Sequence, residues 1–80
     1  MSDVKILPSG DSAVLVQLGS VISPEVNAAV HALDAGIKSA DIKGIVETVP
    51  AFASLLVLYD PIVIGYEEIS GALRALCENP

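Results

Sequence analysis

Two segments of this sequence are apolar at almost every position, and they limit the possible folds more than any other feature. Residues 13–18 read Ala-Val-Leu-Val-Gln-Leu, and residues 54–59 read Ser-Leu-Leu-Val-Leu-Tyr. Both are rich in branched and aromatic residues that favour β-strands. Neither shows the polar–apolar alternation of a strand with one face in water. We therefore expect two strands that are apolar on both faces, one of which needs a cover from outside the chain.

The rest of the chain predicts two further strands and two helices. Residues 4–7 and 45–49 indicate the other strands, with turn-forming residues at 8–11. One helix is predicted from the Ser23 N-cap and Pro24 to near Ala40, and a second from Gly65 through Leu76. The predicted fold class is α+β, in the order β-β-α-β-β-α. It is a two-layer α/β sandwich with a four-stranded, mostly antiparallel sheet and both helices on one face.

Helical spacing divides the helix side chains into a core set and a solvated set. We expect seven apolar residues to be buried against the sheet: Val26, Val30, Leu33, Ile37, Ile69, Leu73 and Leu76. Four polar residues on another face of the first helix are expected to be solvated: Asn27, His31, Asp34 and Lys38.

The second face of the sheet has no predicted cover from within the chain, because both helices lie on the other side. Side chains alternate along a strand, and therefore either Leu56 and Leu58 or the set Leu55, Val57 and Tyr59 must point outward. The mean hydropathy of +0.66 is high for a small domain and is consistent with an extra apolar surface. We expect this face to self-associate, in a two-fold dimer. The alternative is that residues 50–53 or 62–64 fold back over it.

Charge and composition exclude several classes of function. The 80-residue chain has a net charge of −6, and its four basic residues are spread along the sequence. Binding to nucleic acid or to an anionic membrane is therefore not expected. Cys77 is the single cysteine, which excludes an internal disulfide and a cysteine-based zinc site. No signal peptide or membrane-spanning segment is recognisable, and we expect a cytoplasmic location.

The titratable side chains that could carry chemistry lack partners in the sequence. His31 is the only histidine, and it is predicted to lie on the surface with at most a weak local pair with Asp34. Cys77 is predicted to be a small hydrophobic residue of the core rather than an activated thiolate. We expect no catalytic residue, metal or cofactor in this chain.

Two loops contain the candidate binding or interface residues. Gly10, Asp11 and Ser12 would form either a polar loop at a substrate mouth or a turn in which Asp11 caps local N–H groups. Pro50, Phe52 and Ser54 follow the third strand. Phe52 would be either an exposed apolar docking residue or part of the core, and the core is slightly favoured.

Three ordered segments carry a resemblance to a known family. They are residues 7–16, which contain Gly10-Asp11-Ser12-Ala13, residues 23–27, which read Ser-Pro-Glu-Val-Asn, and residues 45–61, which contain Val49-Pro50-Ala51-Phe52 and end in Tyr59-Asp60-Pro61. At this spacing they resemble the N-terminal domain of the family that contains KipI, allophanate hydrolase subunit 1 and the B subunit of 5-oxoprolinase (PxpB). The resemblance covers nearly the whole chain.

The resemblance implies a single domain over residues 1–80, without the second, cyclophilin-like domain of the family. It implies a non-catalytic part of a bacterial hydrolase complex that converts 5-oxoproline to glutamate with ATP, with subunits C and A as partners. Allophanate is the other substrate that the family suggests. The alternatives are a KipI-type inhibitor domain that binds a sensor histidine kinase and a self-associating domain of unknown role.

Overall fold

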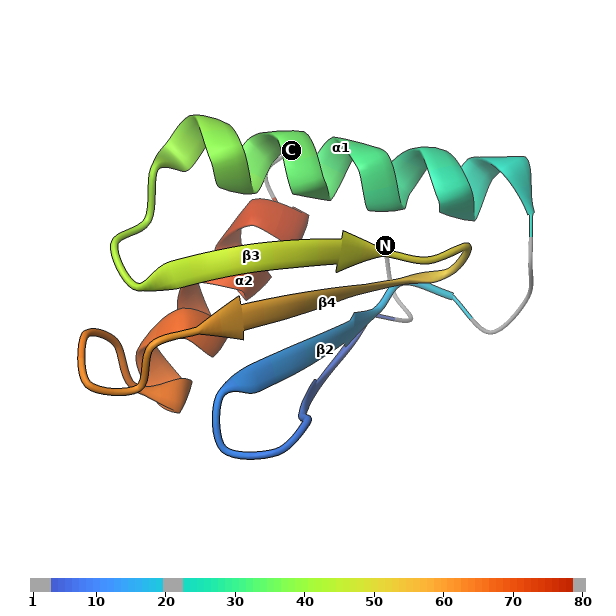
Figure 1. Ribbon diagram of the computed structural model, residues 1–80. Coiled ribbons are helices and arrows are strands. Elements are labelled where there is room, and N and C mark those ends of the chain that lie inside the picture. The colour runs from blue at the N-terminus through green and yellow to red at the C-terminus, as the bar shows by residue number, and fades with distance from the viewer. Residues whose placement is uncertain (1–3, 20–22, 79–80) are drawn as a thin grey trace.

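The computed structural model describes residues 4–19 and 23–78 (Figure 1). In these residues the elements follow the order β-β-α-β-β-α, which confirms the predicted α+β class. None of the helices formed by these residues has the length and hydropathy that a bilayer crossing requires. The elements are β1 (Lys5–Pro8), β2 (Ala13–Gln17), α1 (Pro24–Ala40), β3 (Ile45–Pro50), β4 (Ser54–Tyr59) and α2 (Tyr66–Glu78).

The described strands form one antiparallel sheet in the order β1-β2-β4-β3. The apolar strands β2 and β4 are therefore neighbours in the middle, and β1 and β3 are the edges. The predicted hairpin of the first two strands is confirmed by the pairing of Ile6 with Val16. In the middle of the sheet Val14 pairs with Val57, which in turn pairs with Thr48 of β3.

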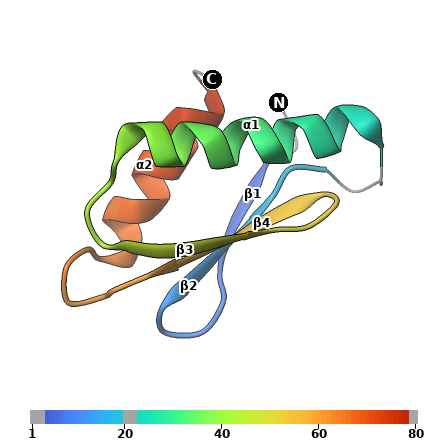
Figure 2. The same cartoon turned by 45° about the horizontal axis from the view of Figure 1, so that its top comes forward.

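Both helices pack against the same side of the sheet, as predicted (Figures 1 and 2). α1 lies against β3 and β4, whereas α2 packs against α1 and β1. Alternate side chains of the central strands point into this layer and have no solvent exposure: Val14, Val16, Leu55 and Val57. Leu56 and Leu58 therefore point to the other side of the sheet.

The predicted core is largely confirmed. Five of the seven helix residues are buried, namely Val30, Leu33, Ile37, Ile69 and Leu73. Val26 and Leu76 are only partly buried. Val26 lies in the first turn of α1 and packs closely on Gly19, where a Cβ would lie 2.8 Å from Cγ2 of Val26. Leu76 lies near the end of α2 beside an open groove.

The first helix begins and ends where the sequence predicts. The Ser23 hydroxyl oxygen accepts the Val26 N–H at 3.2 Å, and Pro24 is the first helical residue. Glu25 in the first turn and Lys38 in the last turn both complement the helix dipole. The C-cap Asp41 has a φ of 51°, a left-handed conformation that ends the helix.

Two glycines permit the turns at one end of the sheet. Gly10 has a φ of 79° in the β1–β2 turn. Gly44 has a φ of 101°, and a Cβ there would lie 2.5 Å from Cγ2 of Ile64. The segment after β4 therefore packs directly on Gly44. The Asp60 N–H donates to the Gly44 carbonyl at 2.7 Å, and the Asp60 carboxylate accepts the Ile62 N–H at 3.0 Å. These bonds confirm Asp60-Pro61 as the end of β4.

Strand β3 differs in one detail from the prediction. The strand was predicted over residues 45–49, and it extends one residue further, to Pro50, which pairs with Leu55. An edge strand tolerates proline because one of its sides has no hydrogen-bonded neighbour. A shift in register between Ile45 and Glu47 leaves Val46 68% exposed.

Candidate protein–protein interface

The side of the sheet that faces away from the helices carries a continuous apolar row. Its centre is formed by Leu15 of β2 and Leu56 of β4, which pair with each other. Leu7 pairs with Leu15 at one edge, and Val49 pairs with Leu56 at the other. Leu58 lies two residues further along β4. We call the side chains Leu7, Leu15, Val49, Leu56 and Leu58 the open face.

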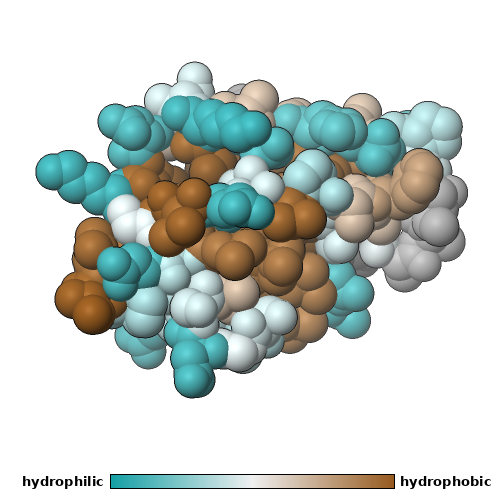
Figure 3. All heavy atoms as spheres, viewed as in Figure 1, coloured by the Kyte–Doolittle hydropathy of each residue, from teal (hydrophilic) through white to brown (hydrophobic). Residues whose placement is uncertain are grey.

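The open face is accessible to solvent. Leu7 and Val49 are 43% and 44% exposed, and the three central leucines are half-buried because neighbouring strands flank them. Figure 3 looks onto this side of the molecule and shows hydrophobic residues gathered over the middle of β3 and β4. An apolar row that crosses all the described strands is a feature of protein–protein interfaces.

The loops at the two ends of the sheet leave this face uncovered. Phe52, which was slightly favoured as a core residue, is 63% exposed, and that prediction is wrong. The β3–β4 turn is closed by the Ala51 N–H, which donates to the Ser54 carbonyl at 2.9 Å, and the phenyl ring points away from the core. Ile62 and Val63 are 94% and 56% exposed, whereas Ile64 is buried in the helix-covered core. The expected alternative, loops folded over the sheet, is therefore not what the structure has.

The predicted candidate residues lie in two groups at opposite ends of the sheet. Gly10, Asp11 and Ser12 form the β1–β2 turn, where the Ser12 carbonyl accepts the Tyr59 N–H at 2.9 Å. This turn is closed by the Ser9 N–H, which donates to the Ala13 carbonyl, rather than by the Asp11 carboxylate.

The second group, Pro50, Phe52 and Ser54, belongs to the β3–β4 turn at the other end. There the Ala53 carbonyl accepts the Leu18 N–H, and the Phe52 carbonyl accepts the amide of Asn27 at 3.4 Å. The two groups do not form one site. Asn27 is half-buried, although the helical pattern predicted it to be solvated.

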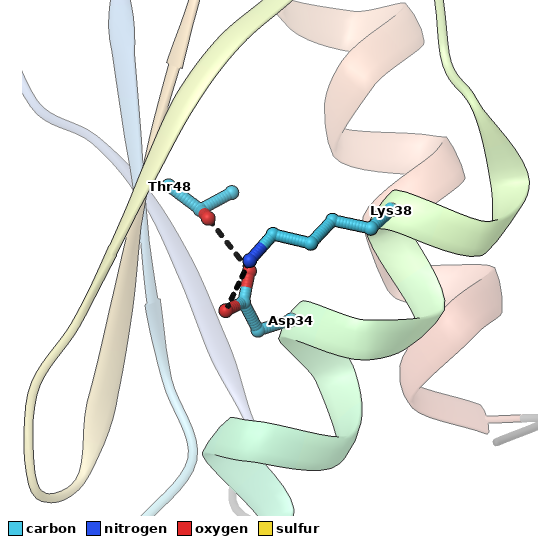
Figure 4. Close-up of polar contacts among 3 residues, drawn as sticks. All are labelled: Asp34, Lys38 and Thr48. Carbon is cyan, nitrogen blue, oxygen red and sulfur yellow. Dashed lines mark hydrogen bonds and ion pairs between the residues drawn. The ribbon is translucent and has the colours of Figure 1, made fainter.

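Asp34 was also predicted to be solvated, and it departs further from that prediction than Asn27 does (Figure 4). Its side chain is only 13% exposed, because it points from α1 toward β3. The Thr48 hydroxyl donates to one carboxylate oxygen at 2.6 Å, and the Lys38 ammonium lies 3.3 Å from the other. The Thr48 bond holds the pKa of the Asp34 carboxyl below its ordinary value of 3.8, with Lys38 assisting and partial burial opposing.

This contact fastens the helix layer to the edge of the sheet. Thr48 is 14 residues from Asp34 in the sequence, and no local pattern pairs them. His31 and Lys38 are exposed, as predicted.

A second apolar surface lies between the two helices. A groove of about 660 Å³ is lined by small and apolar residues, among them Ala29, Ala32, Gly36, Leu76 and Cys77. Burial raises the pKa of the Cys77 thiol, which keeps it protonated and agrees with its predicted role as a small hydrophobic residue. Among the described residues, no three His, Cys, Asp or Glu side chains gather in a way that could hold a metal ion.

The chain belongs to the family described as carboxyltransferase domain, subdomain C and D, whose model matches residues 4–80. Within it, the chain is 45% identical over 51 residues to the B subunit of 5-oxoprolinase from Bacillus subtilis. That alignment covers 64% of this chain and 21% of the relative, and the chain thus corresponds to a small part of the curated protein. This agrees with the resemblance that the three sequence motifs indicated.

Two solved structures share the fold. PH0987 of Pyrococcus horikoshii, described as a conserved uncharacterized protein, matches with a TM-score of 0.87 and 43% identity, over 92% of this chain and 34% of that one. The N-terminal domain of the histidine kinase inhibitor KipI from Bacillus subtilis matches with a TM-score of 0.80 and 29% identity. That match covers 94% of this chain and 84% of the KipI domain, which confirms the predicted N-terminal domain type.

Proposed function

We propose that this chain is a non-catalytic assembly domain of a PxpB-type protein, the B subunit of a 5-oxoprolinase. Its task is to bind other protein surfaces, and the chemistry takes place elsewhere in the complex. In this proposal the complex hydrolyses 5-oxoproline to glutamate with ATP in the cytoplasm, and subunits C and A are its other components. The similarity to the 5-oxoprolinase of Bacillus subtilis supports the choice of complex.

The observation that carries the proposal is the open face. The row from Leu7 through Leu15 and Leu56 to Val49 crosses every described strand. When a second protein surface excludes water from the apolar side chains of such a row, the free energy of the system falls. The candidate residues of the two loops frame this face at its ends: Gly10, Asp11, Ser12, Pro50, Phe52 and Ser54. In our proposal these residues form the rim of the interface.

A second candidate function is a protein-interaction module that inhibits a sensor histidine kinase. The observation in its favour is the match to the KipI N-terminal domain over 84% of that domain. Both functions use the same scaffold, and the partner distinguishes them. Neighbouring genes for subunits A and C would favour the first function, and a neighbouring kinase gene would favour the second.

Binding measurements with purified partners test the proposal. The chain is immobilised and exposed to subunits A and C, and separately to the sensor kinase, all from the same genome. We expect binding to the subunits, and a loss of at least about tenfold in affinity for Leu56→Lys, which places a charge in the apolar row. Ala75→Lys is the matched control, because it adds the same charge at an exposed position of α2 on the other side of the sheet.

Three outcomes would contradict the proposal. One is no binding to either kind of partner, and another is equal weakening by both lysine variants. Hydrolysis of 5-oxoproline by the purified chain alone, abolished by a point substitution within it, would show that the domain is catalytic.

A further inference from the structure

The open face carries a charge pattern that selects a particular kind of partner. Among the described strands, the charged residues are Lys5 on β1 and Glu47 on β3. Lys5 pairs with Gln17, and it comes two residues before Leu7 of the open face. Residues two apart on a strand point to the same side, and therefore the Lys5 side chain is on the open side. Glu47 pairs with Leu58 and likewise points to this side. The strand residues of the open side thus carry one positive and one negative charge, on a chain with a net charge of −6.

The two charges lie at opposite corners of the face. Lys5 comes two residues before Leu7 on one edge strand, and Glu47 comes two residues before Val49 on the other. The order β1-β2-β4-β3 with antiparallel pairing makes β1 and β3 run in opposite directions. Lys5 and Glu47 therefore lie on opposite sides of the apolar row. Within residues 4–19 and 23–78, neither of them has an ion-pair partner.

We propose that the occupant of the open face is a second copy of this chain, in a two-fold dimer whose two sheets cross at nearly a right angle. This inference rests on the proposed function in that both treat the open face as a protein-binding surface. It adds that, in the absence of the subunits, a second copy occupies this surface, and it gives the orientation of that copy.

The charge pattern determines the position of the symmetry axis. In a face-to-face dimer the two-fold axis lies in the plane between the sheets. An axis along the diagonal from Lys5 to Glu47 would place Lys5 of one copy over Lys5 of the other, and Glu47 over Glu47. Both contacts are repulsive. An axis along the other diagonal places Lys5 of each copy over Glu47 of its partner, and forms two reciprocal ion pairs.

The same axis sets the crossing angle of the strands. Four strands at a spacing of about 4.8 Å span about 14 Å between the edge strands, and four residues of strand span about 14 Å in the other direction. The face is therefore nearly square, and a diagonal two-fold axis turns the strands of one copy by about 90° relative to the other. Orthogonal packing is one of the two common ways in which sheets stack. The apolar rows then cross at their centres, where Leu15 and Leu56 lie.

The size of the face predicts a weak dimer. The strands cover about 200 Å² per copy. This is below the ~800 Å² per partner of a stable standard interface. We expect a dissociation constant on the order of 0.1 mM, and a monomer–dimer equilibrium that concentration shifts.

Charge reversal tests the reciprocal ion pairs. Sedimentation equilibrium is measured for Lys5→Glu, Glu47→Lys and the double variant. Each single reversal turns two attractive pairs into two repulsive ones, and we expect dimerisation to weaken by about tenfold. The double variant restores opposite charges across the axis, and the affinity should return to within about threefold of the original. Circular dichroism establishes that each variant is folded.

Arg74→Glu is the matched control for Lys5→Glu. It makes the same change in net charge on α2, an exposed position on the other side of the sheet, and should leave dimerisation within about twofold. Recovery in the double variant supports the inference. Failure to recover, or equal weakening by Arg74→Glu, overturns the proposed orientation.

The failure of this inference is distinguishable from failure of the proposed function. The chain could stay monomeric to about 1 mM and still bind subunits A and C in a manner that Leu56→Lys disrupts. This result would overturn the proposed dimer and leave the proposed assembly function standing. A monomeric chain whose binding does not depend on Leu56 overturns both.

Discussion

The two faces of the sheet are built from neighbouring residues of the same strands, and they differ in how completely they are covered. Leu55 and Leu56 are adjacent in β4, yet Leu55 has no exposed surface and Leu56 is only half-buried. The helices α1 and α2 account for this difference, because both lie on the side of Leu55. The central strands are apolar on both sides all the same.

This comparison separates two reasons for an apolar strand. On the helix side, apolar residues hold the fold together, since their burial is the main source of stability in so small a domain. On the open side, the fold does not require leucine, and a sheet with one face in water usually alternates with polar residues. In our proposal, leucine at these positions is explained by association with another protein surface.

The largest expected effect comes from truncating adjacent leucines on the two faces. Leu55→Ala should lower the free energy of unfolding by about 2–5 kcal/mol, because it leaves a cavity in a closed core. Leu56→Ala should cost less than about 1 kcal/mol in the monomer, since solvent reaches that side chain already. Urea unfolding at low micromolar concentration measures both. Equal costs for the two variants would mean that the open face is part of the core.

A smaller effect is expected where α1 is fastened to the edge of the sheet. Thr48→Val removes the hydroxyl that donates to Asp34, and should cost about 1 kcal/mol at neutral pH. Thr48→Ser keeps a donor and is the control. Both variants are compared with the original chain by thermal or urea unfolding, and an unchanged stability in Thr48→Val would show that the 2.6 Å bond has no net effect.

The pH dependence of this effect has a defined sign. The hydrogen bond lowers the pKa of Asp34 in the folded chain below its unfolded value. Its contribution is therefore fully present above the unfolded pKa and is lost as the pH falls through the folded pKa. The difference between Thr48→Val and the original chain should shrink as the pH falls below about 4. A difference that stays constant to about pH 2 would contradict this cause.

The smallest effect is expected at Phe52, which is exposed at the end of the sheet. Phe52→Ser should change the free energy of unfolding by less than about 0.5 kcal/mol, because the ring contributes little to the core. A cost above about 2 kcal/mol would mean that the ring is buried in solution.

Local signals in the sequence were enough to predict the elements and the layers. Ser23, Pro24 and the spacing of Val30, Leu33 and Ile37 placed α1 almost to the residue. The two apolar segments correctly indicated strands without a polar face. The sequence could not predict the strand order, because pairing between β2 and β4 depends on contacts about 40 residues apart.

The errors have a common physical origin. Asp34 and Asn27 were assigned to the solvent because helical spacing places them away from the apolar stripe. Each is instead half-buried and forms a hydrogen bond with a group from a distant strand or turn, Asp34 with the Thr48 hydroxyl and Asn27 with the Phe52 carbonyl. Periodicity describes one element at a time and does not contain such contacts. The diagonal of Lys5 and Glu47 is likewise visible only once the register of the edge strands is known.

The central claim, that the open face is an association surface and the helix face is not, is tested most directly by leucine methyl NMR over a range of concentrations. The leucine methyl groups report separately on the open face (Leu7, Leu15, Leu56 and Leu58), the core away from the groove (Leu55 and Leu73) and the groove (Leu18, Leu33 and Leu76). Between about 20 μM and about 1 mM we expect the open-face methyl shifts to change together and the core shifts to stay fixed. Shifts that are independent of concentration, or that change only at the groove leucines Leu18, Leu33 and Leu76, would contradict the account.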